Sequence, residues 1–399
     1  MKRTKLVTGI VLTALLSTSC VNEDYDLDDI DMNIGINTDL ELPLINSGEV
    51  TLANFIGDND FLKYTPLPGQ DGEVFYATAS GSFRREFRLI GNGTLENFST
   101  TATDITISDL PDFLKSDDVK LDLKNPVIIA NIERDSRIGD GTITGNIELS
   151  TEGISKCTID GLKAKAGMSS QYVAAEEDSD LPKELLKEGY GTPEWLKPAS
   201  GSVNGIFNER IPNTVSIDVK ELSAEGVTPA YDPSNPYYIN VDMTLYAPLC
   251  IGSTNFQLAY EATETGWQDD FDEDIRKMDV DEITLSATLE NNLPLKTIVE
   301  IKPIDKNGDD VIGLSVLSVE AKENGTTQFT YSLKSNVKGQ TLIDFINGTN
   351  GAKALDGVAI KTMLKASDQS VGKYITKKAS ARLKDVRTKI KGQFVYDAN

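Results

Sequence analysis

Short runs in which apolar and polar residues alternate recur along this chain, and they restrict its fold more than any other feature. The alternation is plain in three runs: Asp104-Ile105-Thr106-Ile107-Ser108, Val215-Ser216-Ile217-Asp218-Val219 and Glu282-Ile283-Thr284-Leu285-Ser286-Ala287. A period of two places every second side chain on the same face of a strand. Each run therefore predicts a half-buried β-strand.

Turn-forming pairs separate the runs, among them Asp140-Gly141, Asn307-Gly308 and Asn324-Gly325. Strands that are joined by such turns form antiparallel sandwiches rather than a parallel sheet with crossover helices. The 399 residues also exceed what one hydrophobic core usually serves. We therefore predict an all-β protein of two antiparallel, immunoglobulin-like β-sandwich domains, residues 36–275 and 276–399.

Helical character is limited to three short segments, which we expect to be insertions between strands. They are residues 181–187, with Pro182 at the first helical position, the acidic residues 270–278, and residues 340–347, which end at Gly348. The first lies within residues 171–202, whose Glu, Pro, Gly and Ser content predicts a loop or helical insertion in the N-terminal domain.

Two segments share the order strand, Asn, Pro, strand: residues 121–129 and residues 285–295. Proline lacks the N–H that a central strand needs, and asparagine tolerates turn geometry, so the pair predicts a kink at a sheet edge. The same order occurs in immunoglobulin-like sandwiches similar to late-embryogenesis-abundant and water-stress domains.

The N-terminus has the pattern of an export signal. Three basic residues precede the apolar residues 6–16, which as a helix would span about 16 Å, roughly half of a bilayer core. Residues 1–19 are therefore predicted to be a signal peptide. Thr18, Ser19 and Cys20 resemble a lipobox, which implies a lipid on Cys20, although Ser17 stands where a lipobox usually has leucine. The alternative is an ordinary secretory signal that releases a soluble protein.

The residues after Cys20 are strongly acidic. Six Asp and Glu residues fall between positions 23 and 31, so residues 20–35 are predicted to be a solvated tether. Such a stretch after a lipidated cysteine resembles the export signal of Bacteroidales surface lipoproteins. The resemblance implies an outer-membrane protein that faces the cell exterior. If the segment is only a flexible acidic tether, it implies no particular cellular location.

Short motifs along the mature chain resemble those of uncharacterised Bacteroidales lipoproteins. They include Leu42-Pro43-Leu44, Tyr246-Ala247-Pro248-Leu249, Asn292-Leu293-Pro294-Leu295 and Leu355-Asp356-Gly357. The resemblance implies an exported, all-β lipoprotein. It implies no activity and no site residues.

Charge and composition exclude several function classes. The net charge is −23, and loss of Lys2, Arg3 and Lys5 with the signal peptide would make it −26. Such a surface repels nucleic acid and anionic lipid, so membrane anchoring must come from acyl chains. The chain contains no histidine, which excludes Ser-His-Asp and Cys-His catalysis and zinc sites that use histidine. We expect no cofactor and no catalytic residue.

Two internal features leave alternatives open. Cys157 and Cys250 could form a disulfide in an oxidising compartment or remain as buried thiols. Residues 305–310 carry oxygen ligands at alternating positions, but Gly308 is misplaced for a calcium loop. A hairpin turn between strands at 296–304 and 311–319 explains that segment without a metal.

Four aromatic residues are the candidate ligand contacts. Trp267 precedes a run of carboxylates, and Tyr231, Tyr237 and Tyr238 flank two prolines in an expected exposed loop. Rings on a stiff loop could stack on a sugar or on a partner protein. The alternatives are that the segment after Trp267 is a polar linker or a short surface helix, and that the tyrosine loop is a rigid connector whose rings pack at a domain edge. We expect Trp195 to be buried.

The sequence thus favours a non-catalytic surface lipoprotein with a structural, adhesive or ligand-capturing role, the ligand being a glycan or a protein. The alternative is a glycan hydrolase that uses two carboxylates. The hydrolase predicts two convergent carboxyl groups about 5 to 9.5 Å apart, whereas the binding protein predicts a row of exposed aromatic rings.

Overall fold

The structure is a computed structural model, and it describes most of the chain after residue 35. The described residues are 36–43, 50–51, 62–90, 94–97, 103–107, 114, 116–165, 169–177, 181–208, 210–227, 234–270 and 279–394. The predicted signal peptide, Cys20, the tether and Tyr231 lie outside these ranges, as do residues 271–278 of the second expected helix.

Two compact units make up the chain, and each is assembled from separate stretches of sequence. Unit 1 comprises residues 1–51, 259–365 and 379–399, and unit 2 comprises residues 52–258 and 366–378. The sequence suggested contiguous domains divided at 275/276. The division differs because β1 (Ile36–Pro43) pairs with the last strand, β21 (Ser380–Phe394), inside unit 1.

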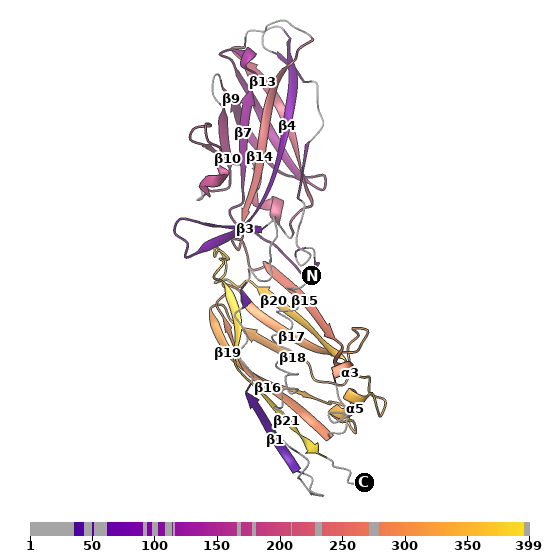
Figure 1. The fold of residues 1–399 in the computed structure, drawn as a ribbon. Coiled ribbons are helices and arrows are strands. Elements are labelled where there is room, and N and C mark those ends of the chain that lie inside the picture. Colours follow the sequence, from indigo (N-terminus) through magenta and orange to yellow (C-terminus); the bar gives the residue numbers. More distant parts are fainter. Residues whose placement is uncertain are drawn as a thin grey trace. The chain divides into compact units, whose positions relative to one another are not determined.

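Unit 1 contains two antiparallel sheets (Figure 1). Sheet A has the order β1, β21, β16 (Asp279–Asn291), β19 (Gly325–Lys334), and β2 (Val50–Thr51) also pairs with β21. Sheet D has the order β15 (Gln257–Thr265), β20 (Gly357–Lys365), β17 (Lys296–Ile304), β18 (Leu317–Ala321). Side chains from both sheets form one buried cluster, which includes Leu285, Leu289, Ile301, Val319 and Val358. Unit 1 is therefore a β-sandwich.

Unit 2 also contains two sheets. Sheet B has the order β11 (Glu194–Leu196), β10 (Ser170–Ala174), β7 (Val127–Arg134), β14 (Tyr237–Pro248), β4 (Glu73–Ile90), β3 (Leu62–Pro66), with β5 (Thr94–Asn97) also on β4. Sheet C has the order β12 (Ser200–Gly201), β9 (Ile154–Ala164), β8 (Thr142–Thr151), β13 (Thr214–Glu225), β6 (Thr103–Thr106). Among these pairings β10 with β11 is parallel. The predicted all-β, antiparallel architecture is confirmed.

Specific contacts join sheet B to sheet C. The Tyr172 hydroxyl on β10 donates to the Lys163 carbonyl on β9 at 2.8 Å and accepts the Lys163 N–H at 3.1 Å. On β4, a Cβ at Gly81 would lie 2.8 Å from Ile105 Cγ1 of β6. Glycine therefore permits the close approach of the two sheets at that point.

Helices are few and short in the described residues. The α-helix α5 (Leu342–Asn347) begins after Thr341 and ends at Gly348, whose φ of 65° is left-handed, so the third expected helix is confirmed. The first is only a 3-10 turn, η5 (Lys183–Leu185), after Pro182. The helix α3 (Trp267–Asp270) stands just before the second expected segment. None of the helices in the described ranges is both long and apolar enough to cross a bilayer.

Cys157 and Cys250 are free, buried thiols, the second of the two alternatives. Burial raises the pKa of Cys157 to about 12 and that of Cys250 to about 11. Both thiols are therefore protonated and unreactive at neutral pH, because the thiolate is the reactive form.

The two Asn-Pro segments serve different structural purposes. Asn291 is fully buried at the end of β16, where its Nδ2 donates to the carbonyls of Leu295 at 2.7 Å and Lys322 at 2.9 Å. Its Oδ1 accepts the Leu293 N–H at 3.1 Å. Asn125 instead has a φ of 63° and donates to the Tyr374 hydroxyl at 3.1 Å. The shared order of strand, Asn, Pro and strand in residues 121–129 and 285–295 therefore does not reflect a structural repeat.

We predict that Asn291→Ala lowers the free energy of unfolding of unit 1 by about 2–4 kcal/mol, because it leaves buried backbone carbonyl and N–H groups without partners. Urea unfolding followed by Trp267 emission would measure the loss, since Trp267 lies in the core of unit 1. The adjacent Asn292 is exposed, so Asn292→Ala is the control. Equal effects of the two substitutions would contradict this role of Asn291.

Candidate functional site

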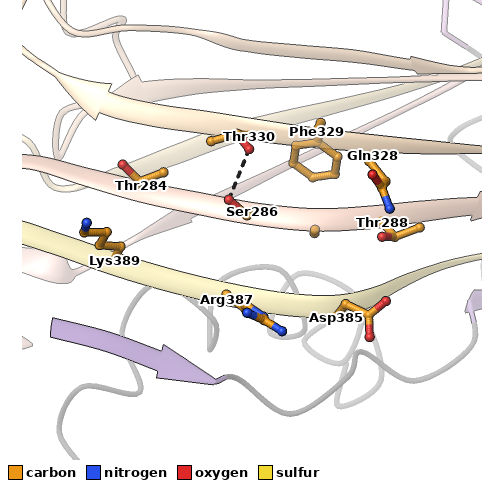
Figure 2. A pocket seen from close by; sticks show the side chains of 10 residues that line it. Thr284, Ser286, Thr288, Gln328, Phe329, Thr330, Asp385, Arg387 and Lys389 are labelled. Carbon is orange, nitrogen blue, oxygen red and sulfur yellow. Dashed lines mark hydrogen bonds between the residues drawn. The ribbon is translucent and has the colours of Figure 1, made fainter. Parts of the chain in front are cut away.

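A polar hollow of about 630 Å³ lies on sheet A of unit 1 (Figure 2). Strands β16, β19 and β21 supply its walls. The lining residues are Thr284, Ser286, Ala287, Thr288, Gln328, Phe329, Thr330, Asp385, Arg387 and Lys389. Most of these side chains are hydroxyls, an amide or charged groups, so the hollow suits a hydrated ligand.

Strand alternation places these side chains on the outer face. On β16, Thr284, Ser286 and Thr288 alternate with Leu285 and Ala287, which are buried in the core. The pairing register sets Ser286 opposite Thr330 on β19 and opposite Arg387 on β21. The Ser286 and Thr330 hydroxyl oxygens lie 3.1 Å apart and are hydrogen-bonded (Figure 2).

A β-bulge shapes one end of the hollow. The register between β16 and β21 shifts from Ser286↔Arg387 to Thr288↔Lys384, so β21 carries an extra residue there. Asp385, within the bulge, has a left-handed φ of 51°. Bulges re-aim side chains at the point where they occur. Asp385 and Arg387, which lie beside this shift in register, are both exposed at the hollow.

Strand β21 is basic within an acidic protein. Its sequence SARLKDVRTKIKGQF contains five Lys or Arg residues and one Asp, whereas the whole chain has a net charge of −23. Glu290 pairs with Lys384 and Arg382 at 2.6 Å each, and their hydrogen bonds lower the pKa of Glu290. Arg387 and Lys389 are the cationic side chains that line the hollow itself.

The lining of the hollow offers hydrogen-bonding and charged groups but a single carboxylate. Asp385 is the single carboxylate among its lining residues, so the hollow lacks the carboxylate pair that glycoside hydrolysis needs. Hydroxyl, amide, guanidinium and ammonium groups can instead donate to and accept from a hydroxyl-rich ligand. Phe329 is the one aromatic ring in the lining, and it is half-buried and packs against the core.

The structure does not bring the sequence-predicted aromatic residues together on a surface. Trp267 is 3% exposed and its ring belongs to the core of unit 1. Tyr237 is 5% exposed and stacks on Phe87, with ring centroids 6.0 Å apart. Neither ring can serve as an exposed platform, because burial against neighbouring strands removes it from solvent. Both rings are instead packed in the interior.

Tyr238 is half-buried on β14 rather than in a loop. The Arg84 guanidinium lies over its ring at 3.7 Å from the centroid. One face of the ring is thus already occupied by a cation. Trp195 is also half-buried, in β11.

The aspartate-rich segment 305–310 is a turn, as its hairpin interpretation requires. Asp305 Oδ1 accepts the N–H groups of Asn307 and Asp309 at 2.9 Å each, and Asp305 Oδ2 pairs with Lys353 Nζ at 2.9 Å. Strand β17 does precede the turn, but β18 begins later than expected, at Leu317. Over the described ranges, no group of three or more Asp, Glu, Cys or His side chains is placed to hold a metal ion.

A carboxylate pair that sequence patterns could not reveal lies on sheet B. Lys187 Nζ is 2.9 Å from Asp242 Oδ2 on β14 and 4.0 Å from Glu133 Oε1 on β7. Glu133 also accepts from the Tyr190 hydroxyl. An ammonium group lies between the two carboxylates, where a hydrolase would hold a glycosidic oxygen or a water, so the pair is an ion-pair network in this structure.

Comparisons with known proteins show the fold. No protein-family model matches the sequence, and curated proteins give no match either. Among solved structures, a protein from Parabacteroides distasonis that is predicted to be secreted is similar, with a TM-score of 0.50 and 15% identity over 88% of this chain and 99% of that chain. The N-terminal CBM22-1-CBM22-2 tandem domain of Xyn10C from Paenibacillus barcinonensis has a TM-score of only 0.18 and 6% identity, over 90% of this chain and 99% of that chain. That score is too low to support an argument.

We predict that Asp305 makes unit 1 sensitive to acid. The hydrogen bond from Lys353, helped by the backbone N–H groups of the turn, lowers the pKa of Asp305 to about 2 from its usual 3.8. A carboxylate with a lowered folded-state pKa adds stability above pH 4 and loses it as the pH falls toward 2. Asp305→Asn should therefore lower the melting temperature at pH 7, and its difference from the wild type should shrink as the pH falls from about 4 toward 2.

Thermal unfolding between pH 7 and pH 2 would measure this difference. Asp310 is exposed at the same turn, so Asp310→Asn is the matched control, with little change at any pH. A difference between Asp305→Asn and wild type that stays constant with pH would contradict the proposed ion pair.

Proposed function

We propose that this protein is a non-catalytic, exported lipoprotein that captures a glycan on the outer face of sheet A. The observation that carries the proposal is the hollow on β16, β19 and β21, where four hydroxyl side chains, an amide and two cations line one cavity. A sugar presents several hydroxyl groups around the rim of its ring. Ser, Thr and Gln side chains both donate and accept hydrogen bonds, so they match such a ligand.

The charges of the hollow favour an acidic glycan. Arg387 and Lys389 provide fixed positive charge next to the hydroxyls. A guanidinium group binds a carboxylate or phosphate with two parallel hydrogen bonds, which are about twice as strong as neutral ones.

The proposed location is the outer membrane, on the outside of the cell. The lipobox-like sequence at Cys20 and the acidic residues 23–31 support a lipid anchor followed by a tether. The similar protein from P. distasonis, a member of the Bacteroidales, is itself predicted to be secreted. Capture of a glycan at the cell surface is consistent with that location and requires no catalytic group.

We predict that the double variant Arg387→Ala and Lys389→Ala binds uronic-acid-containing polysaccharide at least about tenfold more weakly than wild type, because it loses charge-assisted hydrogen bonds. Isothermal titration of the full chain would measure the affinity. The control is Lys302→Ala with Lys322→Ala, which removes two exposed charges from unit 1 away from the hollow. If both double variants bind like wild type, or weaken equally, the hollow is not the binding site.

A further inference from the structure

A short segment of unit 2 covers an apolar patch on the outer face of sheet B. The patch, here called the tyrosine face, consists of buried residues from β4, β7, β10 and β14: Tyr76, Val127, Ile129, Val173, Ala175 and Tyr246. The cover segment is residues 181–198, and four of its side chains pack on the tyrosine face: Leu181, Leu185, Leu186 and Trp195. The tyrosine face is thus closed by this segment and not by sheet C, because its residues alternate with the inward-facing ones, such as Ile128.

The tyrosine face differs from the rest of the same sheet surface. Farther along the strands the outer face is polar: Ser80 and Thr244 are hydrogen-bonded at 2.9 Å, and Asp242 follows Thr244 on that face. An outer sheet face of this kind is ordinarily polar because it meets water. The apolar residues are therefore concentrated where the cover segment lies.

A buried polar atom without a partner lies in the tyrosine face. Tyr246 is 1% exposed, and its hydroxyl oxygen forms no hydrogen bond. Its ring lies 5.2 Å from that of Tyr76. Nearly all buried hydroxyls in proteins have a partner, and exceptions often mark a place that a ligand or water fills. The Tyr246 hydroxyl can donate one hydrogen bond and accept others.

The cover segment is held unevenly. Its C-terminal part is fixed by the pairing of β11 with β10 and by the buried Tyr190, whose hydroxyl donates to Glu133, whereas residues 181–187 are held by side-chain contacts. Its secondary structure is one 3-10 turn and the three-residue strand β11, and its four apolar side chains are only half-buried. Lys187 Nζ donates to Asp242 Oδ2 at 2.9 Å and to the Tyr190 hydroxyl at 3.1 Å. Thr65 Oγ1 donates to Glu184 Oε1 at 2.8 Å. Ion pairs between half-exposed side chains contribute little stability, so residues 181–187 are held more weakly than β11.

We propose that the tyrosine face is a second binding site, for a small, flat, ring-bearing apolar ligand with one hydrogen-bonding group, which enters when the cover segment lifts. The ring would lie against the tyrosines and the Val and Ile side chains. The polar group would meet the Tyr246 hydroxyl, which has no partner while the segment is closed. This site is in unit 2 and does not depend on the proposed capture of glycans in unit 1.

The two tryptophans of the chain make the closure measurable. Trp195 is in the cover segment, whereas Trp267 is buried in unit 1 and contributes a constant background. The test uses the full chain, acrylamide quenching of emission, and the neutral probe N-phenyl-1-naphthylamine. That probe has two aromatic ring systems and one N–H, and it accepts energy from a nearby tryptophan.

Lys187→Met should release the cover segment, raise quenching of Trp195 and tighten probe binding by about fivefold, through a larger open population. Lys220→Met is the matched control, since Lys220 pairs with Asp218 at 2.6 Å on sheet C of the same unit. Tyr246→Phe should weaken probe binding by about fivefold, the worth of one hydrogen bond, without changing the quenching.

Two results would overturn the proposal. One is that Lys187→Met and Lys220→Met give the same quenching and the same probe affinity, which would make the cover segment a fixed part of the fold. The other is that Tyr246→Phe binds the probe as wild type does, which would leave its hydroxyl without a ligand role. Circular dichroism of each variant guards against misfolding, and if Tyr246→Phe misfolds, Trp195→Phe tests the same site by abolishing energy transfer to bound probe.

Discussion

Unit 1 depends on the pairing of β21 with β1 on one side and with β16 on the other. The last strand of the chain pairs with residues 36–43 on one side and residues 279–291 on the other, over registers that run from Ile36↔Phe394 to Pro43↔Arg387 and from Asp279↔Gln393 to Asn291↔Ala381. Sheet A cannot form completely until β21 has paired with β1 and β16. Contacts of such long sequence separation carry a high loop-closure cost and form slowly. The polar hollow depends on the same pairing, because Arg387 and Lys389 lie on β21 and line the hollow only when β21 is paired with β16.

Unit 2 is likewise closed by a distant segment. Residues 366–378 return to it, where Ile375 N–H donates to the Leu249 carbonyl at 2.8 Å and Phe75 N–H donates to the Ile375 carbonyl at 3.1 Å. The chain therefore leaves and re-enters each unit. Because β1 and β21 both belong to unit 1, removal of either strand is expected to disrupt unit 1 before unit 2.

The sequence predicted correctly those elements that are determined by residues close together in the chain. Alternation located β13 and β16, and Thr341 with Gly348 marked both ends of α5. Non-local features were out of reach: nothing in the spacing shows that Arg387 stands opposite Ser286, although alternating Arg387, Lys389 and Lys391 could have marked a basic strand face. The burial of Trp267 and Tyr237 could not be predicted for the same reason, because whether a residue is exposed or buried depends on which distant segments cover it.

We propose that the two units act outside the cell, held by a lipid anchor on Cys20. The decisive experiment compares wild type with Cys20→Ala by mass spectrometry of the N-terminus from native membranes, combined with protease shaving of intact cells. In wild type we expect an acylated Cys20 and loss of both units to external protease, and in the variant an unanchored protein. An N-terminus without acyl chains, or an acylated protein shielded from protease, would overturn the proposal.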